Sequence, residues 1–313
     1  MFRANISGGP CGRLGAPPWP GAAMTVHPLA RRAADAYLAA VDDAAPDLVE
    51  ALYLVGSAAL DDFRPGLSDL DFVAVMASRA GDDVLASLAE VHARLHEVGH
   101  VPGLDGLYAT WDELRSGPVA RAEGPCVEGG RFVRSGRRYR DPMTWCVLRD
   151  DAVTVRGPLC AGTGAWRDPG CLDRWLDASI DGHWRPWLSR VLAALSEDEP
   201  VLLTDGDVEG AVLGLCRLHY ALATGQVPSK SGAGLYGLIA FPAEWRPVVE
   251  EALRIRREPG AAPRYPDPRS RREAVLAFAG FAVADAAALG ADARGRRPRS
   301  RFTGSPAETD HGR

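Results

Sequence analysis

The 313-residue sequence lacks several features that would indicate a secreted, zinc-binding or membrane protein. Its six cysteines form no Cys-x-x-Cys pair and have no histidine partner at metal-ligand spacing, which favours free thiols in a reducing compartment. No apolar run approaches the roughly 20 residues needed to cross a bilayer. The Gly- and Pro-rich start lacks the continuous apolar core of a secretory signal. These absences predict a cytoplasmic protein that does not enter a membrane.

Lysine is almost missing as well, since Lys230 is the only lysine among 36 basic residues. The formal net charge is −5, and the Arg-rich C-terminal end makes the rest of the chain more acidic still. An acidic body argues against a nucleic-acid partner and favours a cationic small-molecule substrate. The same acidity could simply aid solubility. We expect a monomer.

The most informative pattern is a pair of apolar strands with polar residues at one end of each. The first strand, 50–55, ends at Gly56-Ser57, and the second, 70–76, is preceded and opened by Ser68-Asp69-Leu70-Asp71. Side chains at i and i+2 of a strand leave on the same face, so Asp69 and Asp71 should converge. Hard oxygen ligands of this kind suit Mg²⁺, which would keep both carboxylates ionised.

Phosphate-binding groups are expected next to this metal site. Gly56 has no Cβ and lets the backbone approach a ligand, while Ser57 offers an N–H and a hydroxyl where a helix begins. Ser68 offers a further hydroxyl. Taken separately, Gly56-Ser57 could be an ordinary strand-to-helix turn, and Ser68-Asp69 a turn or helix cap.

The order Gly56-Ser57 followed by Ser68-Asp69-Leu70-Asp71 resembles the signature of the polymerase-β-like nucleotidyltransferase superfamily. The second half of the chain is similar to the helical C-terminal domain of aminoglycoside adenylyltransferases that act on streptomycin and spectinomycin. That similarity is carried by Leu215-Cys-Arg-Leu-His-Tyr-Ala-Leu-Ala-Thr-Gly-Gln-Val-Pro-Ser-Lys230 and by Glu244-Trp-Arg-Pro-Val-Val. The resemblance implies an α+β fold, in which a small mixed sheet with helices carries the metal and an α-helical bundle closes over the substrate.

The resemblance also implies roles for three further residues. Leu104-Asp105 aligns with a Leu-Glu pair whose Glu is the catalytic base, so Asp105 becomes a third carboxylate, acting as base or metal ligand. A turn residue beside Gly106 is the alternative. Lys230 aligns with a lysine that binds the triphosphate, although a solvated lysine at a helix start is also possible. Arg256 stands where the family has a tyrosine that contacts ATP, and it could stack on adenine or pair with phosphate.

Acceptor binding is assigned to Asp205 and Asp207, which precede a helix expected over 207–224. Asp207 aligns with an acidic residue that contacts the aminoglycoside in the relatives, and carboxylates suit an ammonium- or guanidinium-bearing sugar. Both residues are equally good helix caps, and this alternative stays open.

The chain divides into a disordered leader (1–25), a nucleotidyltransferase domain (26–163), a helical domain (164–290) and a disordered basic tail (291–313). We expect helices over 28–45 and 81–98, an extended stretch at 103–110, an irregular Gly/Arg-rich segment at 115–140 and a helix or strand pair at 142–156. Helices should then cover 170–195, 207–224, 231–240, 244–257 and 270–289. His92, His96 and His100 are expected to be surface or capping residues rather than metal ligands.

The sequence therefore predicts a Mg²⁺-dependent enzyme that transfers AMP from ATP to a hydroxyl of a streptomycin- or spectinomycin-class molecule and releases pyrophosphate. Asp69, Asp71 and Asp105 would hold the metal and carry the catalysis, and Gly56, Ser57, Ser68, Lys230 and Arg256 would bind ATP. One alternative is a nucleotidyltransferase for another acceptor, such as a protein hydroxyl or a biosynthetic sugar. The other is a regulatory protein that binds nucleotide without turnover.

Overall fold

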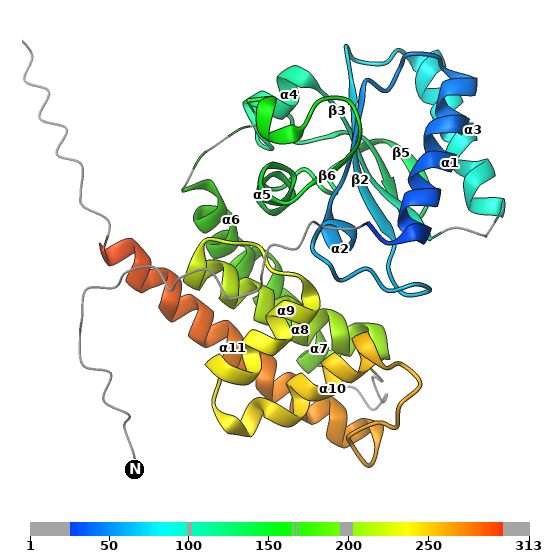
Figure 1. Cartoon of the computed structure of the whole chain (residues 1–313). Helices are drawn as coiled ribbons and strands as arrows, with labels where there is room; N and C mark the ends of the chain where they lie inside the picture. Colours follow the sequence, from blue (N-terminus) through cyan, green and yellow to red (C-terminus); the bar gives the residue numbers. More distant parts are fainter. Residues whose placement is uncertain are drawn as a thin grey trace, which may run out of the picture.

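The computed structural model describes residues 26–98, 102–164, 166, 168, 170–194 and 203–296. Figure 1 shows a sheet-containing N-terminal part and a helical C-terminal part that lie against each other. The predicted α+β fold with a helical C-terminal part is confirmed. The predicted leader (1–25) and most of the predicted tail lie outside the described residues.

The sheet has six strands in the order β5-β4-β3-β2-β1-β6. β2 (Leu70–Met76) and β3 (Leu104–Thr110) run parallel, and the remaining neighbours run antiparallel. Parallel strands begin at the same edge of a sheet, so β2 and β3 place their first residues side by side. The other strands are β1 (Ala51–Leu54), β4 (Gly124–Glu128), β5 (Arg131–Gly136) and β6 (Val153–Arg156).

Both faces of the sheet are covered. Leu52 and Leu54 of β1 point into a core shared with α1 (Pro28–Ala44) and α3 (Asp82–Val98), whereas Ala51 and Tyr53 point into a second core. This alternation follows the two-residue period of a strand, and burial on both faces explains why β1 is apolar throughout. Short helices link the strands: α2 (Gly56–Ala59), α4 (Trp111–Ser116) and α5 (Pro142–Asp150).

The helical part is organised around α8 (Asp205–Thr224), which contacts α9 (Lys230–Ala240), α10 (Arg246–Arg257) and α11 (Pro268–Arg296). A capping box between Thr204 and Asp207 starts α8, and Gly225 ends it in the left-handed conformation. Before α8 come a short turn (Cys160–Gly162), α6 (Cys171–Ser179), a π-helical turn (Ile180–Trp184) and α7 (Arg185–Ala194). A turn at Ala243–Trp245 leads into α10.

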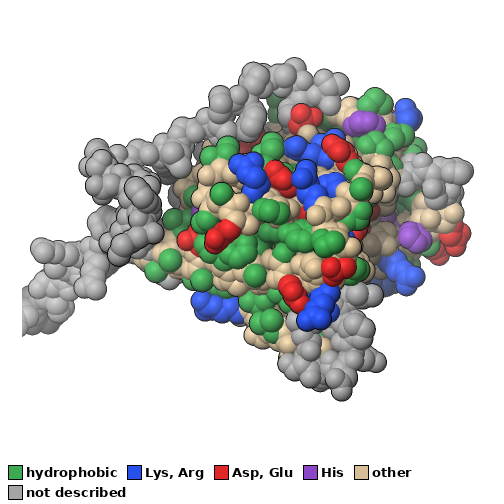
Figure 2. Space-filling model, turned by 90° about the horizontal axis from the view of Figure 1, so that it is seen from below, with side chains coloured by type: hydrophobic (Ala, Val, Ile, Leu, Met, Phe, Trp, Pro, Cys, Tyr) green, Lys and Arg blue, Asp and Glu red, His purple; other side chains and the backbone are tan. Residues whose placement is uncertain are grey.

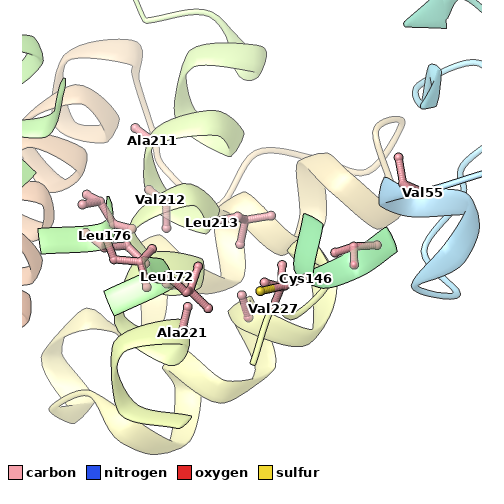
Figure 3. Close-up of a cluster of buried hydrophobic side chains, with 14 of the residues drawn as sticks. Val55, Cys146, Leu172, Leu176, Ala211, Val212, Leu213, Ala221 and Val227 are labelled. Carbon is pink, nitrogen blue, oxygen red and sulfur yellow. The ribbon is translucent and has the colours of Figure 1, made fainter. Parts of the chain in front are cut away.

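One hydrophobic core continues from the sheet into the helical part. Figure 3 shows members of this cluster from α5, α6 and α8, among them Cys146, Leu172 and Val212. The face that points downward in Figure 1 carries hydrophobic side chains mixed with charges of both signs (Figure 2). The site described below lies where the sheet meets the helical part.

Several local predictions were wrong. The segment 115–140 is not irregular, because it contains the end of α4 and the hairpin β4–β5. Helix α11 continues to Arg296, past the predicted end at 289. His92 is not a surface residue: it is buried, its Nε2 lies 2.8 Å from the Tyr108 hydroxyl, and burial lowers its pKa to about 4.

The expectation that no segment could span a membrane also needs correction. Within the described residues, Pro268–Ala291 of α11 is long and apolar enough by length and composition. Ala, Val, Leu and Phe supply its hydropathy, and between Glu273 at its start and Asp292 near its end the helix carries a single charged residue, Asp285. The helix packs along α8, as a core helix does.

The predicted free thiols are confirmed for the five cysteines that the structure describes, all of which are buried.

Candidate active site

Asp69, Asp71 and Asp105 meet at the edge of the sheet where β2 and β3 begin. Asp71 and Asp105 are direct register partners, and Asp69 lies two residues before Asp71. Two glycines make room for the carboxylates. A Cβ on Gly56 would lie 2.0 Å from Asp71 Oδ2, and a Cβ on Gly103 would lie 2.5 Å from Asp69 Oδ1. The predicted convergence of the carboxylates is therefore present in the structure.

The cluster is electrostatically unfavourable without a cation. Burial raises the pKa of Asp71 to about 6, and the negative charges of Asp105 and Asp69 add to the shift, while a hydrogen bond from Tyr139 opposes it. Burial, followed by the charge of Asp105, also raises the pKa of Asp69, against the opposing charges of Arg138 and Lys230. Carboxylates that repel one another in this way favour the binding of a positive charge.

Several groups already contact this cluster. The Tyr139 hydroxyl lies 2.9 Å from Asp71 Oδ1 and 3.2 Å from Asp105 Oδ2. The Gly130 N–H donates to Asp105 Oδ1 at 3.0 Å, and Arg138 Nη2 lies 3.6 Å from Asp105 Oδ2. Asp105 is therefore not a simple turn residue: it is a buried strand residue whose two oxygens are both engaged.

The chemistry of this donor set fits Mg²⁺, because three carboxylates supply hard oxygen ligands beside glycine backbone that leaves space for a phosphate. As the side chains lie, no three His, Cys, Asp or Glu in the described part of the chain already form a metal-binding group. Binding by Asp69, Asp71 and Asp105 together would require their side chains to rotate. The ligand assignment stays a prediction.

The predicted phosphate-binding residues separate into two groups. Gly56 and Ser57 open α2 directly beside Asp71, with Gly56 at φ +57°. Ser68 is buried, and its Oγ accepts hydrogen bonds from the Arg64 N–H and from Arg256 Nη2 at 3.0 and 3.2 Å. Its hydroxyl therefore joins the two parts of the molecule in this structure.

Two basic side chains of the helical part lie close enough to influence the carboxylates electrostatically. Lys230 at the start of α9 influences Asp69, and its Nζ pairs with Glu209 Oε1 at 3.1 Å. Arg217 of α8 influences Asp71, and burial lowers the pKa of Arg217. Its Nε donates to the Pro228 carbonyl, and no ion pair of Arg217 is found among the described residues. A buried arginine facing acidic residues is a candidate phosphate ligand.

Arg256, which was predicted to contact ATP, is buried between the two parts of the molecule. Its buried guanidinium lies 3.4 Å from Asp62 Oδ2 and 3.5 Å from Glu209 Oε1, and it donates to the Asp62 carbonyl at 2.7 Å. Asp62 also accepts from the Ser231 N–H and hydroxyl at 3.0 and 2.6 Å. We call Asp62, Ser231 and Arg256 the interface latch, because Asp62 belongs to the sheet-containing part and the other two belong to the helical part.

Asp205 and Asp207 have partners within the helical part. Asp207 completes the capping box, with its Oδ2 accepting from the Thr204 N–H at 2.9 Å. Asp205 pairs with Arg271 at 2.5 Å and with Arg254 at 3.8 Å. The structure therefore gives both residues the capping and pairing roles that were the alternative to acceptor binding.

Tyr139, Arg138 and Asp62 were not predicted from the sequence. They come from loops without regular periodicity, and the contacts that place them at the site and at the interface join residues 33 to 194 positions apart, so no local pattern identifies them. Arg217 stood inside the segment that carried the resemblance, and its position about two helical turns before the end of α8 gave it no distinct pattern of its own.

Comparison with known proteins identifies the helical part. Residues 188–285 match the family model "Aminoglycoside adenylyltransferase, C-terminal domain". This part of the chain is therefore similar to that domain family. The match covers α8 to most of α11, which are the elements that supply Arg217, Lys230 and Arg256. The predicted family resemblance is confirmed.

A solved structure shares the fold of most of the chain. The crystal structure of spectinomycin adenyltransferase AAD(9) from Enterococcus faecialis with ATP and spectinomycin aligns with a TM-score of 0.59 and 14% identity. The alignment covers 81% of this chain and 98% of that chain. At this identity the likeness shows that the two chains share a fold. Among the curated proteins compared, no significant match was found.

Proposed function

We propose that the protein transfers AMP from ATP to a hydroxyl of a cationic aminoglycoside or aminocyclitol and releases pyrophosphate. One observation carries this proposal. Three carboxylates from Asp69, Asp71 and Asp105 converge at the edge of the sheet, facing the basic Lys230 and Arg217 that the aminoglycoside adenylyltransferase C-terminal domain supplies. Opposite charges on the two parts suit a ligand that carries both a metal ion and a polyphosphate.

In this function Asp69 and Asp71 would hold Mg²⁺, with Asp105 as a third ligand or as the base. When bound, Mg²⁺ would neutralise negative charge on the triphosphate. As the base, Asp105 would accept the proton of the acceptor hydroxyl as its oxygen attacks the α-phosphorus and the bond to the pyrophosphate oxygen breaks. Burial beside the other carboxylates orients Asp105 for this step.

The triphosphate would be bound from both sides. Gly56 permits close approach of the backbone, and Ser57 adds an N–H and a hydroxyl beside Asp71. From the helical part, Lys230 and Arg217 would neutralise the phosphate oxygens and the leaving pyrophosphate. Ser68 and Arg256 would support this arrangement from the interface, and a direct contact of either with ATP would require new side-chain positions.

The acceptor class rests on the matched domain and on the bound spectinomycin named for the structural neighbour. The acidic composition of the chain agrees with a cationic acceptor. Asp205 and Asp207 are kept as proposed acceptor contacts, although Asp207 would have to release Thr204. We also propose that the protein acts as a cytoplasmic monomer. Two functions compete with this proposal: nucleotidyl transfer to another hydroxyl acceptor, and nucleotide binding without turnover.

The test is pyrophosphate release by purified protein supplied with Mg²⁺-ATP and either streptomycin or spectinomycin. We expect release that depends on the acceptor and falls by at least about 100-fold in Asp69→Asn, since positioning of charged groups carries the reaction. Asp112→Asn is a matched control, because Asp112 is an exposed carboxylate paired with Arg115 outside the site. Binding of Mg²⁺-ATP with no release for any acceptor would favour the regulatory function.

A further inference from the structure

The phenol of Tyr139 stands between two of the carboxylates at the proposed metal site. Its oxygen lies 2.9 Å from Asp71 Oδ1 and 3.2 Å from Asp105 Oδ2. A phenol has a single proton to donate, so it can satisfy only one of the two carboxylates at a time. Arg138 adds a positive charge 3.6 Å from Asp105 Oδ2, and its guanidinium carbon lies 5.4 Å from the centre of the Tyr139 ring. The loop thus supplies a proton donor and a cation where the carboxylates repel one another.

The loop that carries Tyr139 is fixed on both sides. Arg140 is buried and donates to the Tyr108 carbonyl of β3 at 2.5 Å, and Asp141 caps α5 by accepting from the Thr144 N–H at 2.9 Å. Between these anchors, Tyr139 has φ +64°, a left-handed conformation that is unfavourable for a non-glycine residue. A bulky residue held in that conformation by its neighbours is a recognised sign of a functional constraint.

The phenol occupies one oxygen of each of two carboxylates that the proposed metal would use. Asp71 Oδ1 and Asp105 Oδ2 both face Tyr139, and Asp105 Oδ1 is taken by the Gly130 N–H. Within the described residues these carboxylates do not already form a three-ligand group. A cation that bound Asp71 through Oδ1 and Asp105 through Oδ2 would compete with the hydroxyl for these two oxygens.

We propose that Tyr139 is a positioning residue whose hydroxyl holds Asp71 and Asp105 together and competes with the divalent cation for their oxygens. This inference rests on the proposed function only in assuming that these carboxylates bind a metal. It predicts that removing the hydroxyl tightens metal binding. A tyrosine that instead orients the carboxylates for the bound metal would have the opposite effect, since its loss would weaken binding.

The experiment is titration of the full chain with Mn²⁺, without nucleotide, followed by electron paramagnetic resonance. We expect Tyr139→Phe to bind Mn²⁺ about tenfold more tightly than the wild type, the size expected for one hydrogen bond to a charged group. Tyr139→Gly should also bind Mn²⁺ more tightly. Because glycine adopts the left-handed conformation without strain, this second variant keeps the test possible if Tyr139→Phe fails to fold. Unfolding scans should show Mn²⁺ raising the midpoint temperature more in both variants than in the wild type.

Tyr53→Phe is the matched control. Tyr53 is also buried in the sheet-containing part, but its hydroxyl donates to the Pro158 carbonyl at 2.8 Å, so its loss should leave Mn²⁺ affinity unchanged. Weaker or unchanged Mn²⁺ binding in both Tyr139 variants would overturn the inference, as would the absence of Mn²⁺ binding in all proteins. Acceptor-dependent pyrophosphate release by the wild type is measured separately, so failure of the proposed function can be recognised independently of these outcomes.

Discussion

Asp71 shows at the residue scale how the site is built at the expense of stability. It lies against Gly56 and beside Asp69 and Asp105, and burial raises its pKa to about 6, well above the usual value for an aspartate. A carboxyl whose folded-state pKa is raised contributes full stability below its unfolded pKa. That stability is lost as the pH rises through the folded pKa. Between about pH 4 and pH 6, ionisation of Asp71 therefore destabilises the fold.

We expect Asp71→Asn to stabilise the protein, most strongly above pH 6, while abolishing transfer activity. The gain has an upper limit of roughly 3 kcal/mol, because each pKa unit corresponds to about 1.4 kcal/mol. Urea unfolding at pH 8.0 and pH 5.0 measures it, and the gain should be clearly smaller at pH 5.0. Asp42→Asn is the control of opposite sign, since Arg156 lowers the pKa of Asp42. A loss of stability in Asp71→Asn at pH 8.0 would contradict the prediction.

At the scale of elements, the site depends on how closely the turn between β1 and α2 approaches β2. Gly56 stands at this turn with φ +57°, and a Cβ there would lie 2.0 Å from Asp71 Oδ2. Both the backbone conformation and the contact exclude a side chain. The strand ends can therefore bring phosphate-binding backbone next to a carboxylate only with glycine at this position.

Gly56→Ala should lower activity by at least about 100-fold and destabilise the fold by roughly 1–3 kcal/mol, because Asp71 must move away from the new methyl group. Gly66→Ala is a close control: Gly66 also has a positive φ, +79°, but a Cβ there would have nothing within 4 Å. The control should show the backbone strain without the loss of activity. Transfer rates and urea unfolding of both variants measure the difference, and equal activities would show that the contact with Asp71 is unimportant.

Much of this element-level arrangement could be predicted from the sequence. The short continuous apolar runs identified β1 and β2, and the Gly56-Ser57 and Asp69-Leu70-Asp71 patterns identified the strand ends that carry the site. The hairpin β4–β5 was not predicted, because Gly and Arg interrupt its apolar alternation. Tyr139 could not have been found, since its position opposite Asp71 depends on how that hairpin and α5 pack rather than on any local pattern.

At the scale of the whole molecule, the two parts are joined by buried charges as well as by a common hydrophobic core. Arg256 of α10 and Ser231 of α9 both bind Asp62, which is 2% exposed. Arg256 also contacts Ser68 and Glu209, and Glu209 in turn pairs with Lys230. Through Arg256, the interface latch therefore connects Ser68, which precedes Asp69, with Lys230 on the helical part. The distance between the carboxylates and Lys230 depends on this connection.

We expect Arg256→Ala to destabilise the protein by roughly 3 kcal/mol, because it removes the buried positive partner of the Asp62 carboxylate and leaves only the half-exposed Arg64, 3.5 Å away. It should also raise the KM for ATP several-fold, since Lys230 and Ser68 lose a common support. Arg254→Ala is the matched control from the same helix: Arg254 is equally buried, but its partners Glu251, Asp205 and the Ala261 carbonyl all lie within the helical part. That control should reduce stability with little change in KM.

Urea unfolding and steady-state pyrophosphate release on both variants separate the two roles. A KM effect confined to Arg256→Ala would place the coupling at the interface latch. Equal KM effects in both variants would mean that any weakening of the helical part disturbs ATP binding. A third result, loss of ATP binding in Arg256→Ala with unchanged stability, would instead support the direct ATP contact expected from the sequence. The buried position of Arg256 between Asp62, Ser68 and Glu209 favours the first outcome.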